Sequence, residues 1–191
     1  MAKNFKDLTE REIVALAIAL EEEDGRIYGD FIDGLRDTYP ASAKMFEEMQ
    51  AEESQHRASL IEIYRQRFGD HIPLIRRQDV KGFVQRRPMW LVRPLGIHAV
   101  RKQVEIMELE TRRFYERAMQ QVSDAGVRKL LGDLAEAEQK HSAAAHALEQ
   151  RILTDEAMKG EDATERRLFV LQIVQPGLAG LMDGSVSTLA P

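Results

Sequence analysis

The chain has 191 residues and a net charge of −5, with 43% hydrophobic and 31% charged residues. A chain of this length and composition can bury one core, so we expect one domain with appendages. It contains no Cys, which excludes disulfides, zinc–thiolate sites and thiol catalysis. The opening residues lack the apolar stretch of a secretory signal, so we expect a cytoplasmic domain.

Two long helices are predicted in the first third of the chain. Thr9 and Glu12 have the spacing of a capping box, so the first helix is expected to begin there and to keep its apolar phase to about Arg36. Pro40 is suited to the first turn of a second helix. That helix is expected to run up to Gly69, which can cap its end.

A long and partly basic connection follows. Residues 70–93 are interrupted by Pro and Gly, which predicts a crossover between the second and third helices of a bundle. Nine Lys or Arg and two Asp lie between Arg65 and Arg101, and the rest of the chain is acidic. This distribution suits the capture of cations, and we expect no nucleic-acid partner. Segment 80–92 mixes basic and apolar side chains, so it could lie on a membrane surface or pack against the bundle or a dimer mate.

Two further helices are predicted in the second half. The third covers residues 95–121, and Ser123 or Asp124 is expected to cap a fourth helix that reaches about residue 153. The four helices are therefore expected to form two hairpins joined by the long connection.

One unit of sequence occurs twice, at an offset of roughly 86 residues. In each copy a Glu precedes a Tyr by seven residues, and a Glu-x-x-His motif follows on the next helix. The copies are Glu21, Tyr28, Glu53 and His56, and then Glu108, Tyr115, Glu138 and His141. A repeat of this size predicts two αα-hairpins, neither of which can bury its apolar face alone. Facing each other, they make an all-α four-helix bundle.

The repeated carboxylates and imidazoles indicate a metal centre. Residues three apart on a helix share one face, and the neighbours on that face are apolar, as Phe46 and Leu60 are beside Glu53. Buried acids and imidazoles are costly unless something compensates them. Four carboxylates carry about −4 and two divalent ions about +4, so the loaded site is expected to be near neutral. Such oxygen and nitrogen ligands suit iron, manganese or zinc.

These motifs resemble those of the rubrerythrin branch of the ferritin-like superfamily, and most of all the erythrin domain of membrane-bound ferritins. The residues that carry the resemblance are Glu21 with Tyr28 and Phe31, Phe46 with Glu53-x-x-His56, Glu105 and Glu108 with Tyr115, and Glu138-x-x-His141. The resemblance implies a ferritin-like bundle that holds two iron ions, with manganese or zinc as substitutes. It also implies that Glu105, one turn before Glu108, is an additional ligand that swings in and out as the oxidation state changes.

The activity implied by the resemblance is that of a ferroxidase, which oxidises Fe(II) with dioxygen or hydrogen peroxide. The expected metal ligands and catalytic residues are Glu21, Glu53, His56, Glu105, Glu108, Glu138 and His141, with Glu53 and Glu138 bridging, Glu21 and Glu108 terminal, and one His on each iron. Tyr28 and Tyr115 are expected to donate hydrogen bonds to inward carboxylates, although ordinary core aromatics would occupy the same places. A rubrerythrin-like peroxidase and a non-enzymatic metal-sensing or gating module are the alternatives. The absence of Cys counts against a peroxidase with its own electron route.

The end of the chain indicates a further, membrane-embedded part. Residues 159–163 form a predicted polar hinge, and 165–175 form a predicted additional C-terminal helix. The last residues, GLMDGSVSTLAP, resemble the opening of the first transmembrane helix of vacuolar iron transporters, with Asp183 at a position on the ion path. We therefore expect a di-iron domain at 1–158, and at 159–191 a hinge, a linker helix and the start of a truncated transporter domain. The intact protein is then expected to be a homodimer at the cytoplasmic face of the plasma membrane, serving iron export.

Other acidic residues and histidines receive no role in the site. The glutamates expected on solvated helix faces are Glu22, Glu23, Glu47, Glu48, Glu52 and Glu110. His71 and His98 have no Glu three residues before them, and His146 is expected to be exposed.

Overall fold

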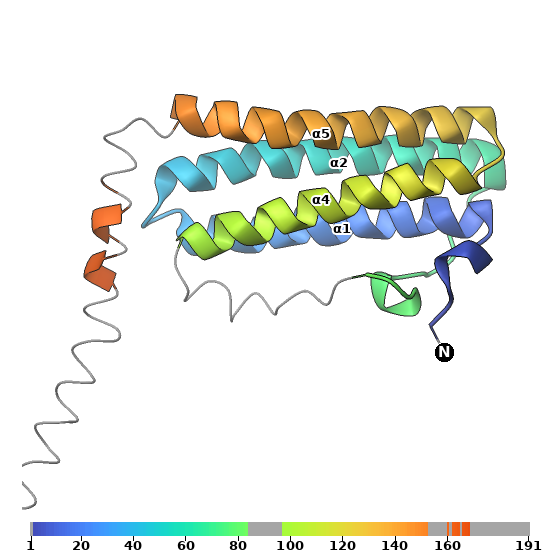
Figure 1. Ribbon diagram of the computed structural model, residues 1–191, viewed down its shortest axis with the longest axis horizontal. Coiled ribbons are helices and arrows are strands. Elements are labelled where there is room, and N and C mark those ends of the chain that lie inside the picture. Colours follow the sequence, from blue (N-terminus) through green and yellow to red (C-terminus); the bar gives the residue numbers. More distant parts are fainter. Residues whose placement is uncertain (1, 84–96, 153–159, 161, 165, 169–191) are drawn as a thin grey trace, which may run out of the picture.

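Four long helices make up the bundle in the computed structural model (Figure 1), which describes residues 2–83, 97–152, 160, 162–164 and 166–168, and only the backbone of residues 98 and 140–152. They are α1 (Glu10–Leu35), α2 (Pro40–Phe68), α4 (Ile97–Gln121) and α5 (Ala125–Ile152), with the short 3-10 helices η1 (Phe5–Asp7) and η2 (Arg77–Asp79). The predicted all-α, ferritin-like four-helix bundle is confirmed. Within the described residues, the predicted ends of the first two helices, the end of the third and the start of the fourth agree with the observed ones to within two residues.

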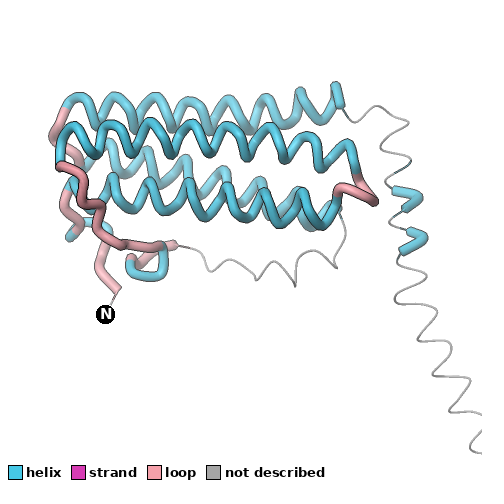
Figure 2. The backbone as a smooth tube through the Cα atoms, turned by 180° about the vertical axis from the view of Figure 1, so that it is seen from behind, coloured by secondary structure: helices cyan, strands magenta, loops and turns pink. Residues whose placement is uncertain are grey.

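The helices run side by side as two hairpins, α1 with α2 and α4 with α5 (Figure 2). The hairpins meet through α2 against α5 and α1 against α4, so the neighbours around the bundle are α1, α2, α5 and α4 in turn. This closed square gives every helix one inward stripe, which is what the amphipathic pattern of the sequence requires.

The helix ends form where local sequence signals place them. Thr9 and Glu12 form the capping box that opens α1, with the Thr9 amide donating to Glu12 Oε2 at 3.0 Å. Pro40 is the first residue of α2, and Gly69 ends it with a φ of 84°, in the left-handed region that favours glycine. Asp124 rather than Ser123 caps α5, because Asp124 Oδ1 accepts a hydrogen bond from the Val127 amide at 2.9 Å.

Replacement of the cap residue of α1 is the first prediction. Thr9→Ala leaves the amide of Glu12 without the hydroxyl oxygen that accepts its hydrogen bond, so we expect a loss of about 1 kcal/mol of unfolding free energy. For a domain of this size, that corresponds to a melting temperature lower by ~2–4 °C. Thr9→Ser keeps the hydroxyl and should melt within a degree or so of the wild type. Equal melting of Thr9→Ala and wild type by circular dichroism would show that the cap does not stabilise the bundle.

The connection between the hairpins is tied to the N-terminus. The Lys3 amide donates to the Asp79 carbonyl and the Lys81 amide donates to the Lys3 carbonyl, both at 2.8 Å. Arg77, in η2, is 8% exposed and its guanidinium lies 2.8 Å from Glu110 on α4. For segment 80–92, the sequence left open whether it lies on a membrane or packs against protein. The structure describes only residues 80–83 of this segment, and the rest lies outside the described residues.

The apolar core is divided into two clusters by a polar layer. On α1 the first cluster ends at Leu20 and the second begins at Tyr28; on α4 the second ends at Met107 and the first resumes at Phe114. The buried residues between these limits are polar, namely Glu21 and Asp24 on α1, and Glu108 and Thr111 on α4. The repeated carboxylates therefore lie at mid-height, enclosed by apolar side chains above and below.

Little of the chain after α5 is described. Residues 160, 162–164 and 166–168 are helical, in the region where the additional C-terminal helix is predicted. Asp183 and the rest of the tail lie outside the described residues. Within the described residues, no helix has the length and apolar character needed to cross a membrane.

Candidate metal centre

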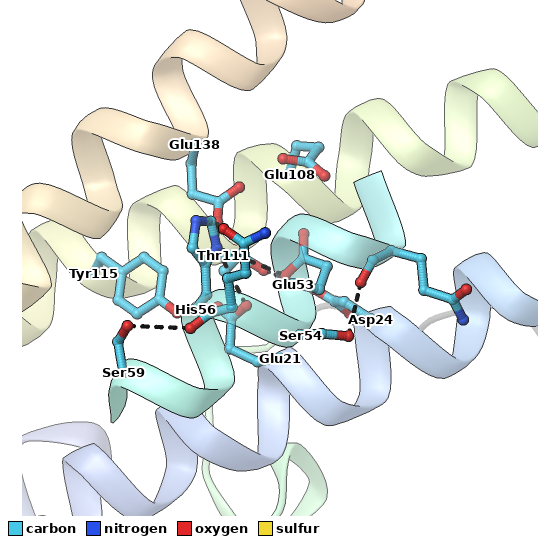
Figure 3. Close-up of polar contacts among 12 residues, drawn as sticks. Glu21, Asp24, Glu53, Ser54, His56, Ser59, Glu108, Thr111, Tyr115 and Glu138 are labelled. Atoms are coloured by element: carbon cyan, nitrogen blue, oxygen red, sulfur yellow. Dashed lines mark hydrogen bonds and ion pairs between the residues drawn. The ribbon is translucent and has the colours of Figure 1, made fainter. Parts of the chain in front are cut away.

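The polar layer receives a buried carboxylate from each helix. Glu21 on α1, Glu53 on α2, Glu108 on α4 and Glu138 on α5 are 1%, 3%, 5% and 2% exposed. His56 lies one turn after Glu53 on α2, and its side chain is 14% exposed. In Figure 3 these side chains converge from different helices on the interior of the bundle.

Four of these residues bring ligand atoms to one place. Glu21, Glu53, His56 and Glu138 each offer one nitrogen or oxygen atom, and these atoms all lie within 4.8 Å of one another. His56 Nδ1 lies 3.5 Å from Glu21 Oε2, 3.4 Å from Glu138 Oε1 and 4.0 Å from Glu53 Oε2. One imidazole nitrogen is therefore surrounded by carboxylates from three helices.

The donor set fits a metal ion. Among the described residues, Glu21 Oε2 and Glu53 Oε2 are buried without a hydrogen-bond partner. A buried carboxylate oxygen in that state carries a desolvation penalty that a cation removes. Carboxylate oxygens with an imidazole nitrogen are suitable ligands for iron, manganese and zinc.

The charges of the layer are strongly coupled in the protein without metal. Burial raises the pKa of Glu53 well above its usual range, and the carboxylates of Glu21, Glu138 and Glu108 raise it further. Burial lowers the pKa of His56, but the carboxylates of Glu138 and Glu21 outweigh this effect and raise its pKa to about 9. Protons therefore partly occupy the place of a cation at neutral pH.

Two tyrosines bond carboxylates of the opposite hairpin. The Tyr28 hydroxyl on α1 donates to Glu108 on α4, and the Tyr115 hydroxyl on α4 donates to Glu21 on α1. Burial and the neighbouring carboxylates raise the pKa of both tyrosines well above the usual value, so both hydroxyls keep their protons. Each bond orients a carboxylate; for Glu21 it uses Oε1 and leaves Oε2 directed at His56.

One buried acid of the layer was missed by the sequence analysis. Asp24 on α1 is 3% exposed, and its Oδ2 accepts a hydrogen bond from Thr111 Oγ1 on α4 at 2.9 Å. Asp24 lies one turn after Glu21 on the same inward face. This helical spacing from Glu21 was the signal that could have identified Asp24 in the sequence. Asp24 is not part of the Glu, Tyr and Glu-x-x-His repeat, so the repeat did not point to it.

The other predicted ligands lie apart from the group of four. Glu108 is buried in the same layer, but it lies outside that group. The Glu105 side chain is 53% exposed and pairs with Lys102 at 2.8 Å. His141 lies on α5 one turn after Glu138, and its side chain lies outside the described residues.

The predicted solvated glutamates mostly lie at the surface. Glu22, Glu47, Glu48 and Glu52 are exposed, and Glu23 is partly exposed. For Glu110 the prediction was wrong, because the guanidinium of Arg77 covers it and leaves its side chain 13% exposed. His71 is exposed, and its carbonyl accepts a hydrogen bond from the Tyr64 hydroxyl at 2.8 Å.

Binding of a divalent ion is expected to release protons. The metal requires an unprotonated imidazole nitrogen and ionised carboxylates, whereas the raised pKa values favour protonated His56 and Glu53. The affinity for Mn(II) should therefore rise with pH and level off above a pH of about 9. Anaerobic titration calorimetry at pH 7 in two buffers of different ionisation enthalpy measures the release. Identical heats in the two buffers would contradict the coupling.

Comparison with known proteins gives a family match that covers this whole layer. A family model described as Rubrerythrin matches residues 12–149, from the first turn of α1 almost to the end of α5. No curated protein and no solved structure matches the chain.

Proposed function

Because the chain belongs to the rubrerythrin family, we propose that its bundle is a di-iron ferroxidase that binds Fe(II) and oxidises it with dioxygen or hydrogen peroxide. The family in general binds iron and carries out oxidoreductase chemistry at a paired metal centre. The observation that carries the proposal is the buried group of Glu21, Glu53, His56 and Glu138, whose ligand atoms lie within 4.8 Å of one another.

The proposed roles follow the two repeats. Glu53 and Glu138, each on a Glu-x-x-His helix, would hold both ions, and Glu21 and Glu108 would each hold one. His56 and His141 would bind one ion each. Tyr28 and Tyr115 hold Glu108 and Glu21 in orientation through their hydroxyls.

The metal and the side chains of the protein contribute different parts of the chemistry. A bound iron pair supplies two electrons, one from each Fe(II), to the oxidant. The carboxylates neutralise the cations in a buried layer, where their attraction is stronger than in water. Glu105, which pairs with Lys102 at the surface, would act as a mobile ligand that swings in and out as the oxidation state changes.

A peroxidase of rubrerythrin type is the second candidate, because the family match supports oxidoreductase chemistry in general and not ferroxidase chemistry in particular. Without Cys such an enzyme needs a separate electron donor. A metal-sensing or gating role without turnover predicts metal binding that does not depend on oxidation.

The wider role rests on resemblance alone. The transporter-like tail leads us to propose that the bundle is a di-iron domain at residues 1–158, followed by residues 159–191 as the link into a membrane transporter. On this proposal the protein is a homodimer at the cytoplasmic face of the plasma membrane and serves the export of iron, with manganese or zinc as substitute metals.

Two measurements test the proposal, first the metal content of the chain and then the oxidation of the bound iron. Fe(II) added anaerobically to the purified chain should bind at two ions per chain, measured by elemental analysis after removal of free metal. Dioxygen or hydrogen peroxide should then convert the bound iron to Fe(III), followed by near-ultraviolet absorbance. Binding of less than one ion per chain would refute the metal centre. Steady peroxide turnover with a supplied reductant, together with slow net oxidation of added Fe(II), would favour the peroxidase.

A further inference from the structure

The bond between Asp24 and Thr111 is the middle member of a row of three between α1 and α4. On one side of it Tyr115 donates to Glu21, and on the other side Tyr28 donates to Glu108. The two tyrosine bonds orient proposed ligands. The bond between them joins two side chains that are each 3% exposed and that have no role in the proposed ligand set.

Asp24 and Thr111 occupy the same position in the two repeats. Asp24 lies three residues after Glu21, and Thr111 lies three residues after Glu108. The two tyrosine bonds are related in the same way, because the Tyr hydroxyl of each hairpin donates to the Glu of the other hairpin. The Asp24–Thr111 contact therefore lies where the approximate two-fold axis that relates the two hairpins passes between α1 and α4.

The two repeats differ in charge at this contact, because the first has an Asp where the second has a neutral Thr. Two Asp at these positions would repel each other, and two Thr would bring no charge. One Asp and one Thr place a single carboxylate near the axis and give it a hydroxyl donor. With Asp24, the buried acids of the described layer become five, namely Glu21, Asp24, Glu53, Glu108 and Glu138. Two divalent ions offset four negative charges, so the layer contains one more.

We propose that Asp24 is a positioning residue that sets the charge of the metal centre, held by Thr111 near the axis and not itself a ligand. The inference rests on the proposed metal centre. A carboxylate attracts a trivalent ion more strongly than a divalent ion at the same distance, because the energy scales with the product of the charges. Asp24 therefore increases affinity for both kinds of ion, and more for the trivalent one.

Removing the charge while keeping the shape provides the test. Asp24→Asn retains an oxygen that accepts from Thr111, so the apo bundle should keep its fold. Its affinity for Mn(II), a divalent probe, should fall on the order of tenfold to hundredfold, and its affinity for Ga(III), a redox-inert trivalent probe, should fall further. Chelator competition measures both constants without any oxidation step. Glu48→Gln removes an exposed carboxylate from α2 and should leave both affinities unchanged.

Two further variants separate charge from helix packing. Thr111→Val keeps the charge and removes the hydrogen bond, so it should lower the melting temperature of the apo protein and change the Mn(II) affinity much less than Asp24→Asn does. The exchange of Asp24→Thr with Thr111→Asp returns the carboxylate to the axis from α4 and should restore the ratio of Ga(III) to Mn(II) affinity. The ratio is a readout that a packing defect would not move.

The outcomes distinguish this inference from the function on which it rests. Wild-type chain that binds neither probe overturns the metal centre and this inference together. Wild-type chain that binds two Mn(II), with Asp24→Asn binding both probes as tightly, overturns only the charge-setting role. A parallel fall of both affinities in Asp24→Asn and Thr111→Val, at an unchanged ratio, assigns the pair to helix packing and also overturns it.

Discussion

Glu53→Gln is expected to abolish iron oxidation and at the same time to make the metal-free protein more stable. Glu53 is 3% exposed and shares its site with the carboxylates of Glu21 and Glu138. Burial and these neighbours raise its pKa well above 4.5, so the folded protein holds this proton more tightly than the unfolded chain. An acid with a raised folded pKa lowers stability as pH rises above its unfolded pKa, and Gln removes that penalty. A gain of about 1–2 kcal/mol is typical when a strained functional group is replaced.

The opposite signs of the two effects make this prediction specific. Thermal unfolding at pH 5 and pH 8 should show a stabilisation of Glu53→Gln that grows with pH, since the penalty increases above pH 4.5. Fe(II) oxidation should fall at least ~100-fold, because a bridging ligand is lost. Glu48→Gln, on the same helix but exposed, should change neither quantity. Oxidation near the wild-type rate, or a destabilised apo protein, would remove Glu53 from the centre.

The fold was predictable because its signals are local. Helical periodicity, the Thr9 capping box, Pro40 at the start of α2 and Gly69 at its end each act within a few residues, and the structure contains all of them. The repeat of Glu, Tyr and Glu-x-x-His added the one long-range fact, that two hairpins are alike. Alike hairpins with one apolar face each have few ways to bury it other than a four-helix bundle.

The partners across the bundle were not predictable from the same signals. Periodicity shows that Tyr28 and Asp24 face inward, but the register between α1 and α4 decides that Glu108 and Thr111 meet them. Ion pairs between the long connection and the bundle could not be predicted from local signals either. Arg77 reaches Glu110 from a connection whose path no local pattern specifies.

The apo bundle carries a stability cost at its centre. The carboxylates divide the apolar core into two clusters, and the Glu21 and Glu53 oxygens that accept no hydrogen bond occupy volume that apolar side chains would fill more favourably. Natural binding sites commonly show this balance between stability and function, since groups that bind a ligand tightly lower the stability of the protein without the ligand. Metal binding then removes the cost at the layer where the two hairpins meet.

Loading with Mn(II) is therefore expected to raise the melting temperature strongly. An ion that binds only the folded state, present at a thousand times its Kd, adds about 4 kcal/mol. At ~2–4 °C per kcal/mol for a domain of this size, one ion raises the melting temperature by ~8–16 °C and a second adds to it. Calorimetry with and without Mn(II) measures the shift, and a chelator should reverse it. Glu53→Gln should start from a higher melting temperature and gain little from the metal. A wild-type melting temperature that does not respond to Mn(II) would mean that the buried acids are compensated by protons alone.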